Sequence, residues 1–263
     1  MYGAILGDIV GSKYEFSKPQ GFNAYTVNLF TSGCRFTDDT VLTVATKYAI
    51  LNDIDYAKAY KMFGNRYRKA GYGDMFLKWL DTGSQKGYNS YGNGSAMRVS
   101  FIGEYFNSLE EVEKQAELSS ICTHDHPRGI AAARATAGMI YLAKNGYTKK
   151  DIEKYLRKNY RYKVCIPLVC YKPFGKFDAT ADGSMPIAIR CFLESDSWES
   201  CMRKAFSIKC DTDTVCCISG SVAEAFYGTT KMPNEELVKR YLITPGRFGD
   251  FDKLLYEWAI KKY

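Results

Sequence analysis

The chain has 263 residues, with 36 basic and 29 acidic side chains, a formal net charge of +7, and 46% hydrophobic residues. This composition is ordinary for a globular protein with a sizeable core. No apolar run approaches the roughly 20 residues that a membrane-spanning helix needs. Residues 1–8 show neither the basic region nor the cleavage site of a signal peptide. We therefore expect a cytoplasmic protein without a membrane partner.

The cysteines and the basic residues exclude several classes of site. None of the nine cysteines forms a C-x-x-C pair, which argues against a zinc ribbon and against a thioredoxin-type motif. An odd number of cysteines without an export signal is typical of reduced thiols that pack as small apolar residues. The lysines and arginines are spread over solvated faces, where they attract an anionic substrate over long range. Because no basic stripe alternates with exposed aromatics, we expect no stable nucleic-acid partner.

Apolar residues at helical spacing predict helices along most of the chain. A first helix closes within residues 7–16, and later helices are predicted at 40–51, 56–69, 109–121, 130–144, 151–159, 185–193, 197–208, 214–227, 234–242 and 251–261. Residues 164–170 have the composition of a short strand, but no second segment would pair with it. No repeat or long linker divides the chain. The prediction is an all-α fold, a single-domain multi-helix bundle of residues 1–263.

Small residues mark two of these helices as interior. Gly3, Gly7 and Gly11 fall four apart on one face of the first helix, where another backbone can approach closely. A central helix carries the alanines 131, 132, 133, 135 and 137. We expect both helices to lie inside the bundle.

Two similar segments each place carboxylates and hydroxyls at the start of an apolar helix. They are Thr37-Asp38-Asp39-Thr40 and Asp211-Thr212-Asp213-Thr214. A single cluster of this kind is most often a helix N-cap, in which one side-chain oxygen accepts a free backbone N–H. Four carboxylates exceed what two caps require, and they would repel one another if the helix starts met without a cation. The pair of segments therefore favours a metal site.

The ligand chemistry limits which metal this site would hold. Carboxylate and hydroxyl oxygens, without thiol or imidazole pairs nearby, select Mg²⁺, Mn²⁺ or Ca²⁺ over zinc. Four carboxylates suffice for two ions roughly 3.5–4 Å apart. The hypothesis requires that residues 37–39 and 211–214 meet in the folded chain.

Three further segments offer supporting groups. Glu15 follows the first helix and, taken alone, is typical of a surface residue. Residues 90–94 (SYGNG) form a glycine-containing loop before a helix, which is typical of phosphate-binding loops and of plain turns. His124 and His126 are the only histidines, and without a third nitrogen or sulfur ligand they favour a capping turn over a zinc site. No serine lies in a G-x-S-x-G motif, so a serine triad is not indicated.

Five segments in order along nearly the whole chain resemble a known family. They are GDIVGSKYEF, FTDDT, SYGNGSAMRVS, THDHP and CDTDTVCCISGSVAEAFYG. Together they resemble the ADP-ribosylglycohydrolase family, which includes the dinitrogenase reductase-activating glycohydrolases and the ADP-ribosyl-arginine and ADP-ribosyl-serine hydrolases. The resemblance implies a compact all-α fold with two Mg²⁺ (or Mn²⁺) ions at the bottom of a cleft. It also implies a hydrolase that releases ADP-ribose from an ADP-ribosylated protein or a small ADP-ribose conjugate.

The resemblance assigns roles to individual residues of this chain. The implied metal ligands are Glu15, Thr37, Asp38, Asp39, Asp211, Asp213 and Thr214. The implied catalytic residues are Glu15, Asp38 and Asp39, with Glu15 as the acid/base or as a mobile metal ligand. The implied ADP-ribose ligands are Ser90, Tyr91, Gly92, Asn93, Gly94 and, near the phosphates, His124. Asp8 is expected to hold the first helix and the site residues in position without binding a metal ion itself.

One departure from the family keeps rival interpretations open. Many relatives carry Gly-Gly where this chain has Lys209 and Cys210. Lys209 would crowd the cleft, point to solvent or touch an anionic ligand. The first rival is a non-catalytic ADP-ribose-binding or crystallin-like protein, and the second is a metal phosphoesterase. The acceptor side is expected to come from residues 17–35 and 160–184, and the chain is expected to be a monomer.

Overall fold

The computed structural model describes residues 1–160, 162–228, 234–243 and 252–263, and there it consists of helices joined by loops. In chain order these are α1 (Tyr2–Gly11), η1 (Ser12–Tyr14), α2 (Asp38–Leu51), α3 (Tyr56–Arg66), α4 (Asp74–Leu80), α5 (Gly94–Met97), α6 (Ser100–Tyr105), α7 (Leu109–Ile121), α8 (Pro127–Lys144), α9 (Lys149–Asn159), η2 (Leu168–Phe174), α10 (Ala181–Leu193), α11 (Trp198–Phe206), α12 (Thr212–Tyr227), α13 (Asn234–Leu242) and α14 (Leu254–Ile260). η1 and η2 are 3-10 helices. Strand pairing in these ranges is limited to one isolated antiparallel bridge between Gly92 and Thr180. The all-α prediction is confirmed.

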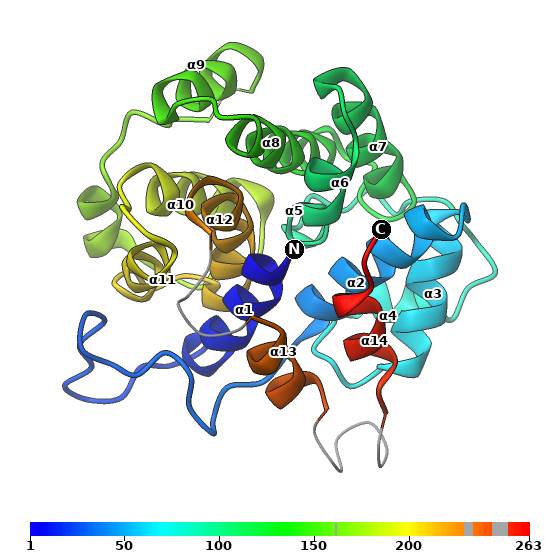
Figure 1. The fold of residues 1–263 in the computed structure, drawn as a ribbon, viewed down its shortest axis with the longest axis horizontal. Helices are drawn as coiled ribbons and strands as arrows, with labels where there is room; N and C mark the ends of the chain where they lie inside the picture. Colours follow the sequence, from blue (N-terminus) through cyan, green and yellow to red (C-terminus); the bar gives the residue numbers. More distant parts are fainter. Residues whose placement is uncertain (161, 229–233, 244–251) are drawn as a thin grey trace.

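The centre of the molecule is the pair α1 and α12, which come from opposite ends of the chain. Figure 1 shows α1 beside α12, with α10 and α11 next to α12 and with α8 across the top of the view. On the other side of α1 lies α2, against which α3 and α14 pack. The starts of α2 and α12 are thereby held against the end of α1.

The glycines of α1 allow this close packing. A Cβ on Gly7 would lie 2.2 Å from the carbonyl oxygen of Cys216, and a Cβ on Gly3 would lie 2.3 Å from that of Gly220. A Cβ on Gly11 would lie 2.5 Å from the Cα of Asp213. Real side chains do not tolerate such distances, so only glycine lets the two backbones meet here. The expectation of a close backbone approach along this face is confirmed.

Helix α8 is the second interior helix. Ala132, Ala133, Ala135 and Ala137 are fully buried, while Ala131 is partly exposed. The helix packs against α5, α6, α7, α10 and α12. The alanine-rich segment therefore lies inside the bundle, as expected.

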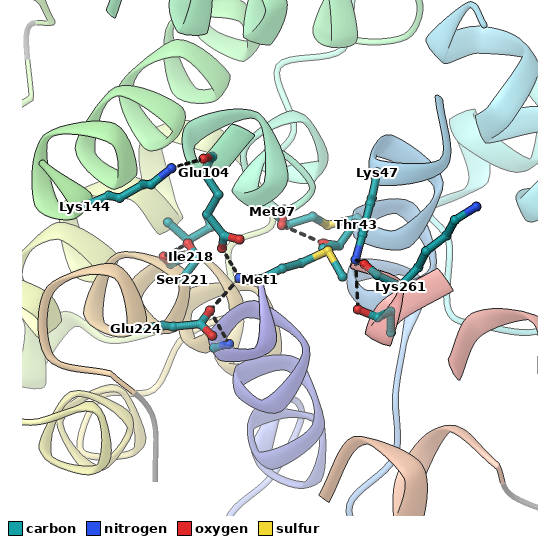
Figure 2. A network of polar contacts seen from close by, with 12 residues as sticks. Met1, Thr43, Lys47, Met97, Glu104, Lys144, Ile218, Ser221, Glu224 and Lys261 are labelled. Atoms are coloured by element: carbon teal, nitrogen blue, oxygen red, sulfur yellow. Dashed lines mark hydrogen bonds and ion pairs between the residues drawn. The ribbon is translucent and has the colours of Figure 1, made fainter. Parts of the chain in front are cut away.

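Ion pairs of Met1 and hydrogen bonds of Lys47 join helices that are distant in the sequence. Figure 2 shows the amino group of Met1 between the carboxylates of Glu104 and Glu224, with 2.7 Å to Glu224 Oε2. Lys47 of α2 donates to the carbonyl oxygens of Ala259 (3.1 Å) and Lys261 (2.6 Å), at the end of α14. These bonds join α1, α6 and α12 on one side, and α2 to α14 on the other.

The observed helices differ from the predicted ones mainly at their starts. Helices α2, α8, α10 and α12 begin two to four residues earlier than predicted, because polar capping residues and a proline occupy their first turns. Residues 164–170, considered as a strand, form a turn followed by the beginning of η2. The predicted helix 251–261 corresponds to α14, and residue 251 lies outside the described residues.

Two further observations concern membrane-spanning helices and the state of the cysteines. In the described residues, every helix is too short or too polar to cross a membrane. All nine cysteines are free, seven of them buried, and Cys165 and Cys170 exposed. The buried thiols pack as apolar residues, in keeping with the composition.

Candidate metal and substrate site

The two acidic segments meet at the starts of α2 and α12. Thr214 donates from Oγ1 to Oδ2 of Asp39 at 3.3 Å. Thr37 caps α2 in an extended conformation, and its Oγ1 accepts the amide of Asp39 at 3.3 Å. Asp211 precedes α12, and its carboxylate accepts no capping hydrogen bond from the amides of that helix; its Oδ2 accepts from Asn93 Nδ2 instead. The convergence that the metal hypothesis requires is present.

Asp8 of α1 fixes the start of α2 from behind. Its carboxylate accepts the amide and hydroxyl of Thr37 (2.8 and 2.7 Å) and the amide and hydroxyl of Thr40 (3.1 and 2.5 Å). Four hydrogen bonds to one fully buried carboxylate hold the first turn of α2 against α1.

Five carboxylates form two overlapping groups. Asp8, Asp39 and Asp213 bring one oxygen each within 4.8 Å of one another, and so do Glu15, Asp211 and Asp213. The Asp39 Oδ1 atom is buried and has no hydrogen-bond partner among the residues that the structure describes. A buried carboxylate oxygen without a partner is costly, and a cation would satisfy it. The residues present therefore fit a divalent cation centre.

The pKa values of these groups show the electrostatic cost of the arrangement. Burial, followed by the charges of neighbouring carboxylates, raises the pKa of Asp39 and Asp213 well above the ordinary range, and also that of Asp38, which belongs to neither group. Burial and then the charge of Asp213 raise the pKa of Glu15 to about 8. Burial raises the pKa of Asp211 to about 6, although hydrogen bonds from Asp213 and Asn93 oppose the rise. A bound cation would stabilise the charged forms of all five.

A cavity of about 450 Å³ opens above the carboxylates, a size typical of small-molecule sites. The residues that line it are Glu15, Phe16, Asp38, Asp39, Leu42, Gly71, Gly73, Asp74, Met75, Phe76, Tyr88, Ser90, Gly92, Asn93, Gly94, Met97, His124, Phe177, Ala179, Asp211, Asp213 and Thr214. Eleven of the thirteen expected site residues are in this lining. The exceptions are Thr37, which lies behind Asp39, and Tyr91, whose half-exposed ring packs on His126.

The 90–94 loop joins this cavity to the acidic cluster. Asn93 is buried, and its Nδ2 donates to Asp211 Oδ2 and to Ser184 Oγ, both at 2.8 Å. The amide of Gly92 donates to Ser90 Oγ at 3.2 Å, and the Gly92 backbone pairs with Thr180. Asn93 thus orients Asp211, a contact that the sequence pattern alone does not predict.

His124 faces the same loop. Its side chain is buried, and its Nε2 lies 3.1 Å from the place of a Cβ on Gly94 and 3.4 Å from that of a Cβ on Gly92. Its Nδ1 lies 2.8 Å from Thr123 Oγ1. Burial, and then the charge of Arg98, lowers its pKa well below the ordinary range. His124 is therefore a neutral ring with one nitrogen close to the glycines of the loop.

Residues 71–76 contribute a part of the lining that sequence reasoning missed. Gly71 has a φ of +122°, and a Cβ there would lie 3.3 Å from Asp38 Oδ1. The Gly-x-Gly-Asp pattern of residues 71–74, just before α4, was a usable signal for this approach. Phe177 and Ala179 come from the expected range 160–184, whereas no described residue of 17–35 lines the cavity.

The unusual Lys209 does not enter the cavity. It is exposed, and its backbone carbonyl would lie 2.8 Å from a Cβ on Gly175. Lys209 was expected to crowd the cleft, to point to solvent or to touch an anionic ligand, and the structure shows it exposed to solvent. The replacement of Gly-Gly by Lys209 and Cys210 therefore leaves the cavity open.

Comparisons with known proteins agree with the geometry. The family model described as ADP-ribosylglycohydrolase matches residues 1–247. ADP-ribosylhydrolase ARH3 of Mus musculus is 25% identical over 88% of this chain and 83% of its own length, and the Homo sapiens protein is 24% identical over 88% and 85%. ADP-ribosylarginine hydrolase Tri1 of Pseudomonas putida (strain GB-1) is 24% identical over 91% and 72%.

A solved structure supports the fold independently. A chain titled "ADP-ribosylglycohydrolase-related protein complex" superposes with a TM-score of 0.67 and 19% identity, covering 98% of this chain and 93% of that one. At this identity the likeness shows a shared fold.

Proposed function

Because the chain belongs to the ADP-ribosylglycohydrolase family, we propose that it is a metal-dependent hydrolase that releases ADP-ribose from an acceptor. The bond cleaved is the N- or O-glycosidic bond to a protein side chain, such as arginine or serine, or to a small conjugate. The observation that carries this proposal is the cluster of carboxylates at the cavity, with the buried, unpartnered oxygen of Asp39 among them.

The residues that would hold divalent cations are the six cavity-lining ones of the expected set: Glu15, Asp38, Asp39, Asp211, Asp213 and Thr214. Bound there, Mg²⁺ or Mn²⁺ supplies charge neutralisation and Lewis-acid polarisation of oxygen groups. Thr37 and Asp8 keep Asp39 and the first turn of α2 in place.

The loop of residues 90–94 and His124 are proposed to hold the pyrophosphate of ADP-ribose. Ser90, Gly92, Asn93, Gly94 and His124 line the same cavity as the carboxylates. Contacts to a group remote from the reacting bond bind and orient the substrate, so that the anomeric carbon lies at the carboxylates.

Glu15 is the residue that we propose moves a proton at the reacting bond. It is half-buried and lines the cavity, so that its carboxyl can meet the reacting atoms of a bound conjugate. Cleavage at an anomeric carbon passes through an oxocarbenium-like transition state, in which the leaving group gains negative charge. A carboxyl that protonates the leaving atom, or accepts a proton from attacking water, lowers this barrier.

The proposal is tested by measuring ADP-ribose released from arginine- and serine-modified proteins, with product identification by mass spectrometry. We expect release with Mg²⁺, and loss of release with a chelator or in Asp38→Asn. Asp55→Asn, a change at the exposed start of α3, is the matched control and should behave as the wild type. Full activity in chelator would contradict the proposal, and AMP as the product would favour a phosphoesterase instead.

The rival proposal is a non-catalytic ADP-ribose binder. Its main support was Lys209, which lies outside the cavity lining. A calorimetric titration with ADP-ribose, set beside the release assay, separates the two: a binder retains ADP-ribose but releases none from any conjugate. We also expect the chain to act as a monomer, which sedimentation at assay concentration checks.

A further inference from the structure

A buried cation lies behind the histidine of the cavity. Arg98 follows α5, is fully buried, and has its guanidinium 4.1 Å from the ring centre of Tyr60. Its Nη2 donates to the carbonyl of Ser119 (2.7 Å) and to Thr123 Oγ1 (2.8 Å). Ser119 lies in the last turn of α7, where the helix dipole and the aromatic face both favour a positive charge. Arg98 thus holds Thr123 from one side.

The geometry around Thr123 decides where its hydroxyl proton goes. The guanidinium has no acceptor atom, so Thr123 Oγ1 must accept from Arg98. Two acceptors remain for its own proton: His124 Nδ1 at 2.8 Å and the carbonyl of Ser120 at 3.4 Å. That carbonyl already accepts the amides of Thr123 (3.0 Å) and His124 (2.7 Å). Both lone pairs of the Ser120 carbonyl are therefore in use, and the proton goes to His124 Nδ1.

We propose that Arg98 and Thr123 hold His124 in the tautomer that carries its proton on Nε2, so that His124 presents an N–H donor to an anionic oxygen in the cavity. The inference rests on the proposed function, in which that oxygen belongs to the pyrophosphate of ADP-ribose. Arg98 and Thr123 are positioning residues in this scheme, and neither is in the cavity lining.

The opposite tautomer would repel the same ligand. A neutral imidazole has one donor nitrogen and one acceptor nitrogen. If Nδ1 carried the proton, the lone pair of Nε2 would face the pyrophosphate beside Gly92 and Gly94. The lowered pKa of His124 supports a neutral ring. The tautomer therefore determines whether His124 attracts or repels the substrate.

The test is a long-range ¹H–¹⁵N spectrum of the full chain with ¹⁵N-labelled histidine. The chain contains two histidines, and His126→Gln assigns the signals. We expect His124 to show a protonated Nε2 and an unprotonated Nδ1 at pH 7. Thr123→Val should lose this pattern, and Thr123→Ser, which keeps the hydroxyl, should restore it. A wild-type His124 with its proton on Nδ1 would overturn the inference.

A binding measurement on the same variants links the tautomer to the ligand. Calorimetry with ADP-ribose should show affinity roughly 5- to 20-fold weaker for Thr123→Val, the loss expected when a hydrogen-bond partner is misplaced, and near wild type for Thr123→Ser. Weaker binding of Thr123→Val with an unchanged His124 pattern would reveal a purely structural role and overturn the inference. If the wild type binds no ADP-ribose, the proposed function fails, while the spectrum still decides the tautomer.

Discussion

Thr214 donates a hydrogen bond to Asp39, although 175 positions separate them in the chain. The contact joins the first turns of α2 and α12, both of which are held against α1. Each helix start brings partial positive charge from its free amides, which offsets part of the carboxylate charge. Burial, and then the charges of neighbouring carboxylates, raises the pKa of Asp39 and Asp213 well above the ordinary range, and a cation would stabilise their charged forms.

Replacing the proposed acid/base should reduce turnover without preventing binding. We expect Glu15→Gln to lower kcat by about 10²- to 10⁴-fold, the usual contribution of a positioned acid or base, with a small change in KM. Steady-state kinetics on an ADP-ribosylated protein measure both. Glu110→Gln, on the exposed start of α7, is the control. A Glu15→Gln enzyme of wild-type kcat would remove this residue from the mechanism.

Metal should stabilise the protein more at high pH than at low pH. Folding raises the pKa of Glu15 from 4.5 to about 8 and that of Asp211 from 3.8 to about 6. A carboxyl raised in the folded state favours folding below its unfolded pKa, and this contribution disappears as pH rises through the folded value. The metal-free protein should therefore lose stability between pH 4 and pH 8, the window that these shifts define.

The measurement is the thermal midpoint with and without Mg²⁺ at several pH values. Saturation at one hundred times the dissociation constant adds about 2.7 kcal/mol, or roughly 5–10 °C for a chain of this size. We expect this shift near pH 8 and a much smaller one near pH 5, because protons compete for the same oxygens. A shift that does not vary with pH would be inconsistent with carboxylate ligands.

The contact between α1 and α12 should not tolerate a methyl group. Gly7→Ala places a Cβ against the Cys216 carbonyl, so we expect a loss of about 1–3 kcal/mol in the free energy of unfolding, typical of overpacking. Urea denaturation measures the loss. Gly83→Ala, where a Cβ has open space around it, is the control. If Gly7→Ala and Gly83→Ala had the same free energy of unfolding, the close contact between α1 and α12 would not restrict the side chain at position 7.

Phe177 should affect the acceptor rather than ADP-ribose. Its ring lies 5.6 Å from that of Phe16 at the cavity wall, next to Glu15. Phe177→Ala should raise KM for a conjugate by roughly 2- to 10-fold, the range of a lost aromatic contact, and leave free ADP-ribose binding unchanged. Phe174→Ala removes an exposed ring of η2 outside the cavity lining and should change neither. Equal effects of the two variants would count against an acceptor contact.

Sequence periodicity predicted the longer helices because a buried face repeats over several turns, as in α7, whose predicted and observed bounds agree. The short helices α4 and α6 were missed because six or seven residues give too little periodicity, whereas the helix expected after the 90–94 loop is α5. The acidic motifs were visible as residue types and the glycine face of α1 was visible from its spacing, but the spacing does not say which helix packs against that face. The hydrogen bonds that Asn93 donates to Asp211 and that Thr40 donates to Asp8 are tertiary contacts, and a single sequence carries no direct sign of them.

Direct cation binding tests the central claim, that residues 37–39 and 211–214 form one oxygen-lined metal centre. Mn²⁺ titration followed by electron paramagnetic resonance counts bound ions per chain, with Asp39→Asn as the site variant and Asp55→Asn as the control. We predict two ions bound to the wild type and to Asp55→Asn, and a loss of tight binding in Asp39→Asn. Wild-type protein that binds no Mn²⁺, or an Asp39→Asn variant that binds it equally well, would contradict the account.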